Sequence, residues 1–205
     1  MTAMTQRVLD VSALPQRTAD NRALVWWGNL AMLAIEGTMF AMLFATYLYL
    51  RLVNVAWPPP SVPRPELLWP TINLAILAGS LIPAMVVDRA ALRENLTAVR
   101  IGQTLCVVAA IVFLAIRVRV MADLGFKWSD HAYGSIVWSI LGFHTFHVIA
   151  ATGETALLLL YGFVRPVERK QLLDFRTTAI YWYFVVATWV PFYFVIFVMP
   201  WGHRK

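Results

Sequence analysis

The sequence predicts an all-α, polytopic integral membrane protein with five transmembrane helices. Of the 205 residues, 60% are hydrophobic and only 14% are charged, whereas a soluble domain carries about 25% charged residues. The apolar residues also come in long blocks, each close to the ~20 residues that a helix needs to cross a bilayer. Because a chain in lipid must satisfy its own backbone hydrogen bonds, each block is expected to be a helix.

The N-terminal third begins with a polar tail, residues 1–22, which lacks the apolar core of a secretory signal, so the first helix is expected to insert uncleaved. The first helix is predicted at 23–50, followed by Arg51. Proline cannot donate a backbone hydrogen bond and clashes with a preceding helical turn. The run Trp57-Pro58-Pro59-Pro60 therefore predicts a stiff, extended loop.

Two further helices are predicted in the middle of the chain, at 67–87 and 101–116. Pro83 lies inside the first of these and should kink it. Charged residues predict loops at 88–100 and 117–132.

The remaining helices are predicted at 133–161 and 178–199, with a charged loop at 165–176 between them. The five helices would form one transmembrane domain, residues 23–200, followed by a short basic tail at 201–205. Most of the nine tryptophans, Trp182 among them, fall near predicted helix ends and indicate an interfacial aromatic belt.

The distribution of basic residues predicts the orientation. With the N-terminus inside, the inner segments hold ten of the 17 Lys and Arg residues, which leaves seven outside. Loops rich in Lys and Arg tend to stay in the cytoplasm, so we expect a cytoplasmic N-terminus and a C-terminus on the outer side. Basic residues spread singly over short loops do not indicate a nucleic-acid site.

Two carboxylates lie inside predicted helices, where ionisable groups are costly and need a reason. Glu36 is near the middle of the first helix and Glu154 is in the fourth. Each could be a protonatable group coupled to proton movement. Glu36 could instead be a neutral carboxyl that holds helices together, and Glu154 could reach the inner interface.

His144 and His147 share one face of the fourth helix with Ala151 and Glu154, and this stripe is expected to face protein. Two histidines three apart point the same way and cannot be the opposite axial ligands of one heme iron. A zinc or copper site would need further ligands. Hydrogen bonding between helices is therefore the favoured role of the pair, and no metal is expected.

The residue counts also exclude redox roles. Four histidines and one cysteine, Cys106, cannot supply the six histidines that bind the hemes and copper of a heme-copper oxidase catalytic subunit. They cannot supply the two cysteines of a dinuclear copper site either. Cys106 is interpreted as a small buried hydrophobe.

Several motifs, taken in order, resemble the heme-copper terminal oxidase subunit III family over nearly the whole chain. Glu36 is followed by a Met-Phe pair and then by the tryptophan-proline loop. Asn73 and Ser80 match polar positions of the next helix. The most specific stretches are Tyr133-Gly134-Ser135, Gly142-Phe143-His144 and His147-Val148, followed by Tyr181-Trp182 and Phe184-Val185 in the last helix.

The chain departs from the family pattern at several positions. Tyr183 and Val186 replace a usual histidine and aspartate, and Thr145 replaces a common glycine. A Gln and Glu pair is replaced around Arg117 and Val120. These departures leave open whether the partner is a cytochrome c oxidase, a quinol oxidase or a nitric oxide reductase system.

The resemblance implies a V-shaped, lipid-holding helix bundle that docks on catalytic subunit I and subunit II, possesses no redox centre and supports proton uptake. Hemes and copper would lie in the partner subunits, and a larger respiratory supercomplex is a further expectation. Glu36 would be the family's intramembrane glutamate. His144, His147 and Asn73 would pack helices, and Arg51 and Trp57 would contact lipid headgroups. The expected location is the bacterial inner membrane.

Two functions of other classes remain open from the sequence. A small stand-alone channel or transporter could use Glu36 and the fourth-helix stripe as a polar path. The odd number of helices and the lack of matched halves count against an inverted-repeat transporter. A small heme cytochrome is disfavoured by the ligand geometry of the histidine pair.

Overall fold

The computed structural model describes residues 24–167 and 171–202, and these form helices without any β-strand. Five helical segments are long and apolar enough to cross a membrane, so the chain is a multi-span membrane protein as predicted. The expected tail 1–22 lies outside the described residues, as do His203 and the end of the basic C-terminal tail. The helices are α1 (Leu24–Val53), α2 (Leu68–Gly79), α3 (Leu81–Leu92), α4 (Leu96–Ala122), α5 (Ala132–Val164), α6 (Leu172–Tyr193), the π-helical η2 (Phe194–Val198) and α7 (Met199–Gly202).

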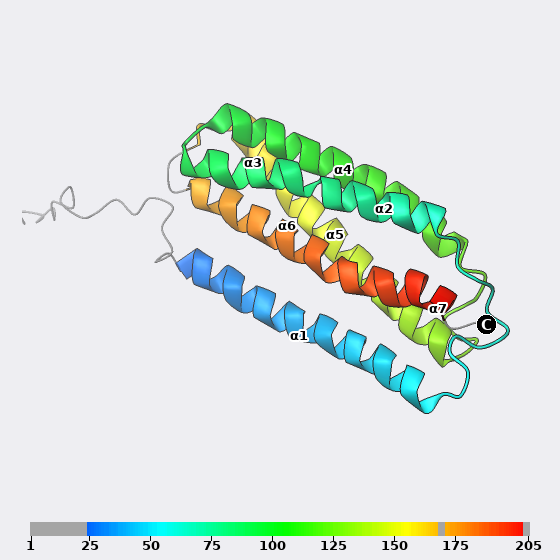
Figure 1. Cartoon of the computed structure of the whole chain (residues 1–205). Coiled ribbons are helices and arrows are strands. Elements are labelled where there is room, and N and C mark those ends of the chain that lie inside the picture. The colour runs from blue at the N-terminus through cyan, green and yellow to red at the C-terminus, as the bar shows by residue number, and fades with distance from the viewer. Residues whose placement is uncertain (1–23, 168–170, 203–205) are drawn as a thin grey trace, which may run out of the picture.

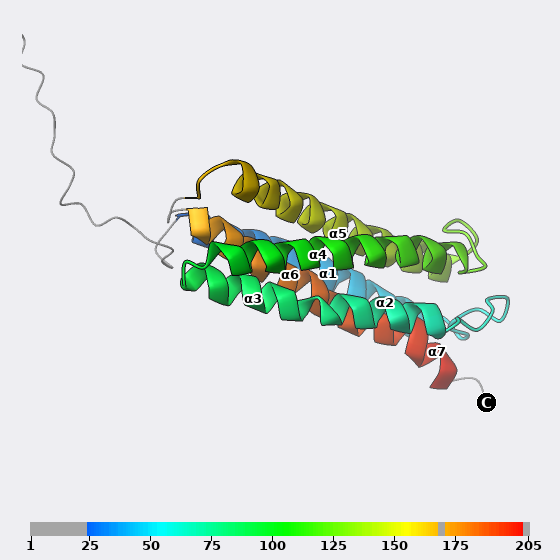
Figure 2. The ribbon, with the colours of Figure 1, turned by 90° about the horizontal axis from the view of Figure 1, so that it is seen from above.

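Helix α6 holds the bundle together. It lies between α1 on one side and α2, α3 and α4 on the other (Figure 1). Helix α1 packs on α5 and α6, and most of its surface is exposed. The start of α1, the α3–α4 turn, the end of α5 and the start of α6 lie at one end of the bundle, which we call the N-side end (Figure 2). The proline loop and the α4–α5 loop lie at the other end.

The second span is interrupted as the sequence predicts. Helix α2 ends at Gly79, and α3 begins at Leu81. Pro83 has no backbone N–H to donate to the carbonyl of Gly79, four residues earlier, so the helical ladder is broken at this turn. Where α4 crosses α3, Gly102 allows close approach, since an added Cβ would lie 2.7 Å from Val87 and 3.0 Å from the Pro83 carbonyl oxygen.

The largest differences from the predicted helix ends lie where charged residues extend a helix. The expected loop 88–100 is only a short turn, since α3 runs to Leu92 and α4 starts at Leu96. Helix α4 continues to Ala122, so Arg117 lies within the span and not in a connection. Helix α6 begins at Leu172, inside the expected loop 165–176.

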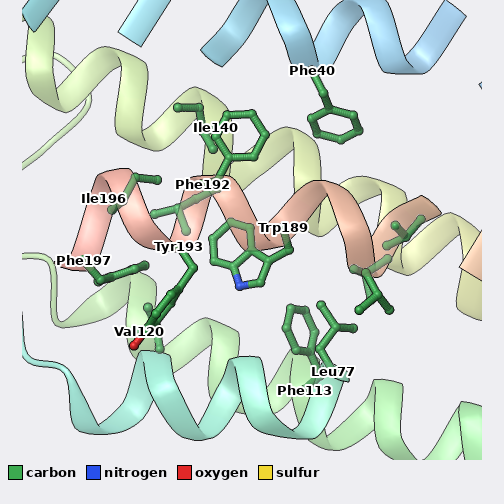
Figure 3. Close-up of a cluster of buried hydrophobic side chains, with 14 of the residues drawn as sticks. Phe40, Leu77, Phe113, Val120, Ile140, Trp189, Phe192, Tyr193, Ile196 and Phe197 are labelled. Atoms are coloured by element: carbon green, nitrogen blue, oxygen red, sulfur yellow. The ribbon is translucent and has the colours of Figure 1, made fainter. Parts of the chain in front are cut away.

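One continuous core joins all five spans (Figure 3). Trp189 of α6 is 1% exposed and lies at its centre. Figure 3 shows side chains from α1, α2, α4 and α5 packed around it. Trp182 is also buried, at 3% exposed, so the interfacial position predicted for it is wrong. The V-shaped, lipid-holding cleft stays a prediction.

The last helix widens near its end. Pro191 lies inside α6 and removes one backbone donor, and the π-helical turn η2 follows it. The hydroxyl of Tyr47 on α1 donates a 2.6 Å hydrogen bond to the Val195 carbonyl in this turn. This bond joins the first and last spans at the end of the bundle opposite the N-side end.

Candidate intramembrane polar site

Glu36 and His147 face each other in the interior of the bundle. The Glu36 Oε2 and His147 Nε2 atoms are 3.7 Å apart, and the side chains are 21% and 9% exposed. His147 Nδ1 lies 2.6 Å from the Phe143 carbonyl. A carbonyl only accepts, so Nδ1 carries a hydrogen and Nε2 of a neutral ring is an acceptor. An attractive contact therefore requires a proton on either the imidazole or the carboxyl.

Tyr181 of α6 completes the surroundings of Glu36. The residue is 4% exposed, and its hydroxyl interacts electrostatically with the Glu36 carboxyl. The ring of Phe40 lies 4.9 Å from that of His147 and closes the other side. Three helices thus contribute to the surroundings of Glu36. Together with Thr178 and Glu154, which are described next, Glu36, His147 and Tyr181 form a group that we call the edge cluster.

Glu154 is exposed on the surface of the chain, so this end of the predicted fourth-helix stripe is not buried within the bundle. At about 100° per residue, Ala151 lies only about 20° around the helix from His144, while His147 lies about 60° and Glu154 about 80° away. His144 and Ala151 are accordingly 0% and 1% exposed, and His147 is 7% exposed. Glu154 accepts a 3.2 Å hydrogen bond from the hydroxyl of Thr178.

His144 lies in a second cluster, which we call the core cluster (His144, Trp189, Arg117 and Phe113). Its Nε2 lies 3.0 Å from the Val185 carbonyl of α6. Its ring is 4.6 Å from the Trp189 ring and 6.1 Å from that of Phe113. These contacts place His144 in the packing of α5 against α6 and α4.

Arg117 is a buried site residue that the sequence did not indicate. It is 1% exposed, and its guanidinium carbon lies 3.8 Å from the Trp189 ring centre and 4.7 Å from that of Phe113. None of its side-chain nitrogens has a hydrogen-bond partner within the described part of the chain. Stacking on two aromatic faces stabilises a buried cation, but it leaves the donors unsatisfied. The feature of the sequence that could have indicated a buried Arg117 is its position directly after the apolar block that includes Phe113.

Three further polar residues are buried in the bundle: Ser80 between α2 and α3, Asn73 on α2 and Gln103 on α4. Ser80 Oγ accepts a 2.9 Å hydrogen bond from the Trp182 indole and donates to the Leu77 carbonyl. Asn73 is 2% exposed, and neither its amide oxygen nor its nitrogen has a partner among the described residues. The same holds for Gln103 of α4, which is 1% exposed. Asn73 is therefore buried without a hydrogen bond to another described residue, and its packing role stays a prediction.

Arg51 and Trp57 line one open cavity of about 560 Å³ beside the end of α1. Arg51 Nη1 lies 2.6 Å from the Met199 sulfur. The Trp57 ring lies 5.6 Å from that of Tyr47 and 5.1 Å from that of Tyr133. The two residues expected to contact lipid headgroups are thus close together.

The tyrosine-glycine-serine motif has a local structural role at the start of α5. The Gly134 amide donates a 2.8 Å hydrogen bond to His131 Nδ1, which caps the helix. A Cβ on Gly134 would lie 2.5 Å from the Lys127 carbonyl oxygen, so only glycine fits. Across 24–167 and 171–202, no three His, Cys, Asp or Glu side chains gather as a metal site would require.

The fold and the site together define a multi-span helical membrane protein. Its candidate functional groups are protonatable side chains that lie where helices contact each other. The sequence profile of the cytochrome c oxidase subunit III family matches residues 8–203. The chain belongs to this family, which makes it a subunit III of the heme-copper oxidases and part of an oxidoreductase complex.

Curated relatives have the same name. Cytochrome c oxidase subunit 3 of Thermostichus vulcanus is 28% identical over 178 residues, which cover 84% of this chain and 86% of the relative. The protein of the same name from Synechocystis is 29% identical over 177 residues, covering 84% and 75%. That of the sea star Patiria pectinifera is 26% identical over 182 residues, covering 86% and 69%.

Proposed function

We propose that this chain is the non-redox subunit of a terminal oxidase of the cytochrome c oxidase type, where it supports proton uptake and protects the catalytic subunit during turnover. The observation that carries the proposal is the Glu36–His147 pair at 3.7 Å. A carboxyl and an imidazole held inside a membrane bundle can share and exchange one proton. A role in packing alone would need no second protonatable group beside the carboxyl.

The partners in this proposal are catalytic subunit I, subunit II and membrane lipids, within a possible larger assembly of respiratory complexes. The hemes and copper belong to the partner subunits. A phospholipid headgroup would be held by Arg51 and Trp57, since a guanidinium pairs with phosphate and an indole favours the interface. The chain would lie in the bacterial inner membrane with its N-terminus in the cytoplasm and its C-terminus outside.

The departures at Tyr183, Val186 and Arg117 leave a quinol oxidase or a nitric oxide reductase system as the alternative partner. These positions lie on α6 and α4 and do not contribute to the Glu36–His147 pair. The choice of electron donor therefore does not change the role proposed for Glu36.

The test is the catalytic lifetime of the oxidase that contains Glu36→Ala. We expect assembly to be largely intact and the initial rate to be close to that of the wild type, followed by progressive loss of activity during turnover. Glu66→Ala is the matched control, because Glu66 is an exposed carboxylate outside the spans. Equal lifetimes of the two variants over many turnovers would exclude a proton role for Glu36.

A further inference from the structure

Helices α4 and α5 leave an open groove between them at the N-side end of the bundle. The start of α4 and the end of α5 lie together at this end (Figure 2). The groove has a volume of about 330 Å³. It is lined by five residues of α4 and one of α5, namely Thr97, Arg100, Ile101, Thr104, Leu105 and Phe163. We call it the α4–α5 groove, and none of these residues belongs to the edge cluster or the core cluster.

Arg100 forms the polar wall of the α4–α5 groove. Its Nη2 donates a 2.5 Å hydrogen bond to the Gly162 carbonyl in the last turn of α5, and its guanidinium carbon lies 5.2 Å from the Phe163 ring centre. The bond satisfies one of the carbonyls that a helix end leaves without a partner. A guanidinium has five N–H groups, however, and the Nε of Arg100 is buried without a partner among the described residues. Capping α5 therefore does not use the whole guanidinium.

The surroundings of Arg100 favour an anion. Among the described residues that line the groove, none is acidic. Thr97 lies in the first turn of α4 and adds a hydroxyl that can donate a hydrogen bond. The positive end of the helix dipole and the free amides of a helix N-terminus lie at the same place. Guanidinium and hydroxyl donors at a helix N-terminus match phosphate, which arginine binds through paired N–H groups.

Helix α4 exposes a stripe of branched apolar side chains that starts in the groove and continues beyond it. Its members are between 43% and 57% exposed, and we call Ile101, Leu105, Val108 and Val112 the α4 stripe. At about 100° per residue, they lie within about 60° of one another around the helix. The rise from Ile101 to Val112 is about 16 Å, close to half of the ~30 Å hydrocarbon thickness of a bilayer. The α4 stripe therefore extends through the depth of one leaflet.

A phospholipid fits this surface better than a helix of a partner subunit does. Helices that pack against each other in a membrane favour small residues at the contact, whereas the α4 stripe contains neither glycine nor alanine. A helix that crossed the whole bilayer would also have no use for a guanidinium at one end of the contact. A cation followed by an apolar stripe of one leaflet's depth matches a lipid phosphate followed by an acyl chain.

We propose that the α4–α5 groove binds one phospholipid of the leaflet at the N-side end. The lipid phosphate accepts hydrogen bonds from Arg100 and Thr97, and one acyl chain lies along the α4 stripe. This site is at the opposite end of the bundle from the cavity lined by Arg51 and Trp57. It does not involve Glu36, so its test is independent of the proton role proposed above.

The experiment maps photo-crosslinks from a phosphatidylglycerol that contains a diazirine in one acyl chain, added to the full chain in phosphatidylcholine nanodiscs. Mass spectrometry of the digested chain gives the labelled positions. We expect the α4 stripe to be labelled more strongly than other exposed helix faces. Labelling of the stripe should fall about tenfold in Arg100→Gln, because a hydrogen bond to a charged group changes affinity by about that factor. Arg93→Gln is the matched control, since Arg93 is exposed at the same end and does not line the groove.

A second variant separates lipid binding from the packing of Arg100 on α5. Leu105→Trp keeps Arg100 and fills the groove, so labelling should fall while the melting temperature stays close to that of the wild type. Equal labelling of the α4 stripe in Arg100→Gln and Arg93→Gln would overturn the proposal. Uniform labelling of all exposed helix faces, which is the result expected for bulk lipid alone, would overturn it as well. So would crosslinks between the stripe and a partner subunit in the intact oxidase.

Discussion

His144 and His147 are three residues apart on α5, yet they belong to two different kinds of site. The core cluster around His144 is closed off by the chain itself, with Trp189 and Phe113 against the ring. The edge cluster around His147 is less enclosed, because 21% of the Glu36 side chain is exposed and Glu154 lies on the surface of the chain. The comparison teaches that a shared helix face does not imply a shared role. The core cluster lies within the packing of three helices, and the edge cluster contains the groups for which we propose proton exchange.

Trp189→Ala should have the largest effect on stability, because it empties the centre of the core cluster. Trp189 is 1% exposed, and truncating a buried tryptophan costs about 3–5 kcal/mol. Thermal unfolding of the chain in detergent measures this loss, with Trp128→Ala at an exposed tryptophan as the control. Equal melting of the two variants would show that the core cluster does not hold the bundle together.

Arg117→Met tests whether the buried cation of the core cluster stabilises the fold. Replacing a buried charge by an apolar side chain of similar size is often neutral or stabilising by about 1–4 kcal/mol. Because Arg117 has no hydrogen-bond partner among the described residues, we expect the melting temperature to stay unchanged or to rise. A lower melting temperature would reveal a favourable interaction beyond stacking on Trp189 and Phe113.

Exchanging each histidine for leucine compares the two clusters directly. His147→Leu should loosen helix packing and lower the stability of the complex in detergent. His144→Leu should lower it further, because His144 is 0% exposed and is placed against the Val185 carbonyl of a second helix. Losing a buried hydrogen-bond partner costs about 1–3 kcal/mol. Unaltered stability of His147→Leu would contradict its packing role, and a smaller loss for His144→Leu would reverse the comparison.

Thr178→Val should cause the smallest loss of stability among the variants expected to destabilise the chain. It removes one hydroxyl from the edge cluster while keeping the side-chain shape, and a single hydrogen bond contributes about 0.5–1.5 kcal/mol. We expect a small drop in melting temperature, compared with Thr46→Val, whose exposed hydroxyl bonds only within α1. A drop as large as that of Trp189→Ala would place Thr178 in the core.

The number and order of the spans could be predicted from the sequence, because length and hydropathy alone decide which segments can cross a bilayer. The break near Pro83 could also be predicted, since it depends on the chemistry of one residue. The end of α4 could not. Arg117 and Arg119 look like loop residues by charge, but their guanidinium groups stack on Trp189 and Trp69, aromatic residues that are distant in the sequence.

The same limit applies to the candidate site. The spacing of Glu36 within its helix predicted an intramembrane carboxyl, and the histidine pair predicted a buried polar face. Neither pattern could show that Tyr181 of the last span lies near Glu36, because that contact depends on how α6 packs against α1 and α5. The exposure of Glu154 depends on the same packing.

The account requires that this chain works within a heme-containing oxidase. Gentle detergent purification of the tagged chain from its native membrane, with mass spectrometry and a reduced-minus-oxidised spectrum, tests this most directly. We predict co-purification with oxidase subunits and heme a, o or b bands, which would also identify the electron donor. A colourless chain purified alone after mild extraction would contradict the account and favour a stand-alone channel or transporter.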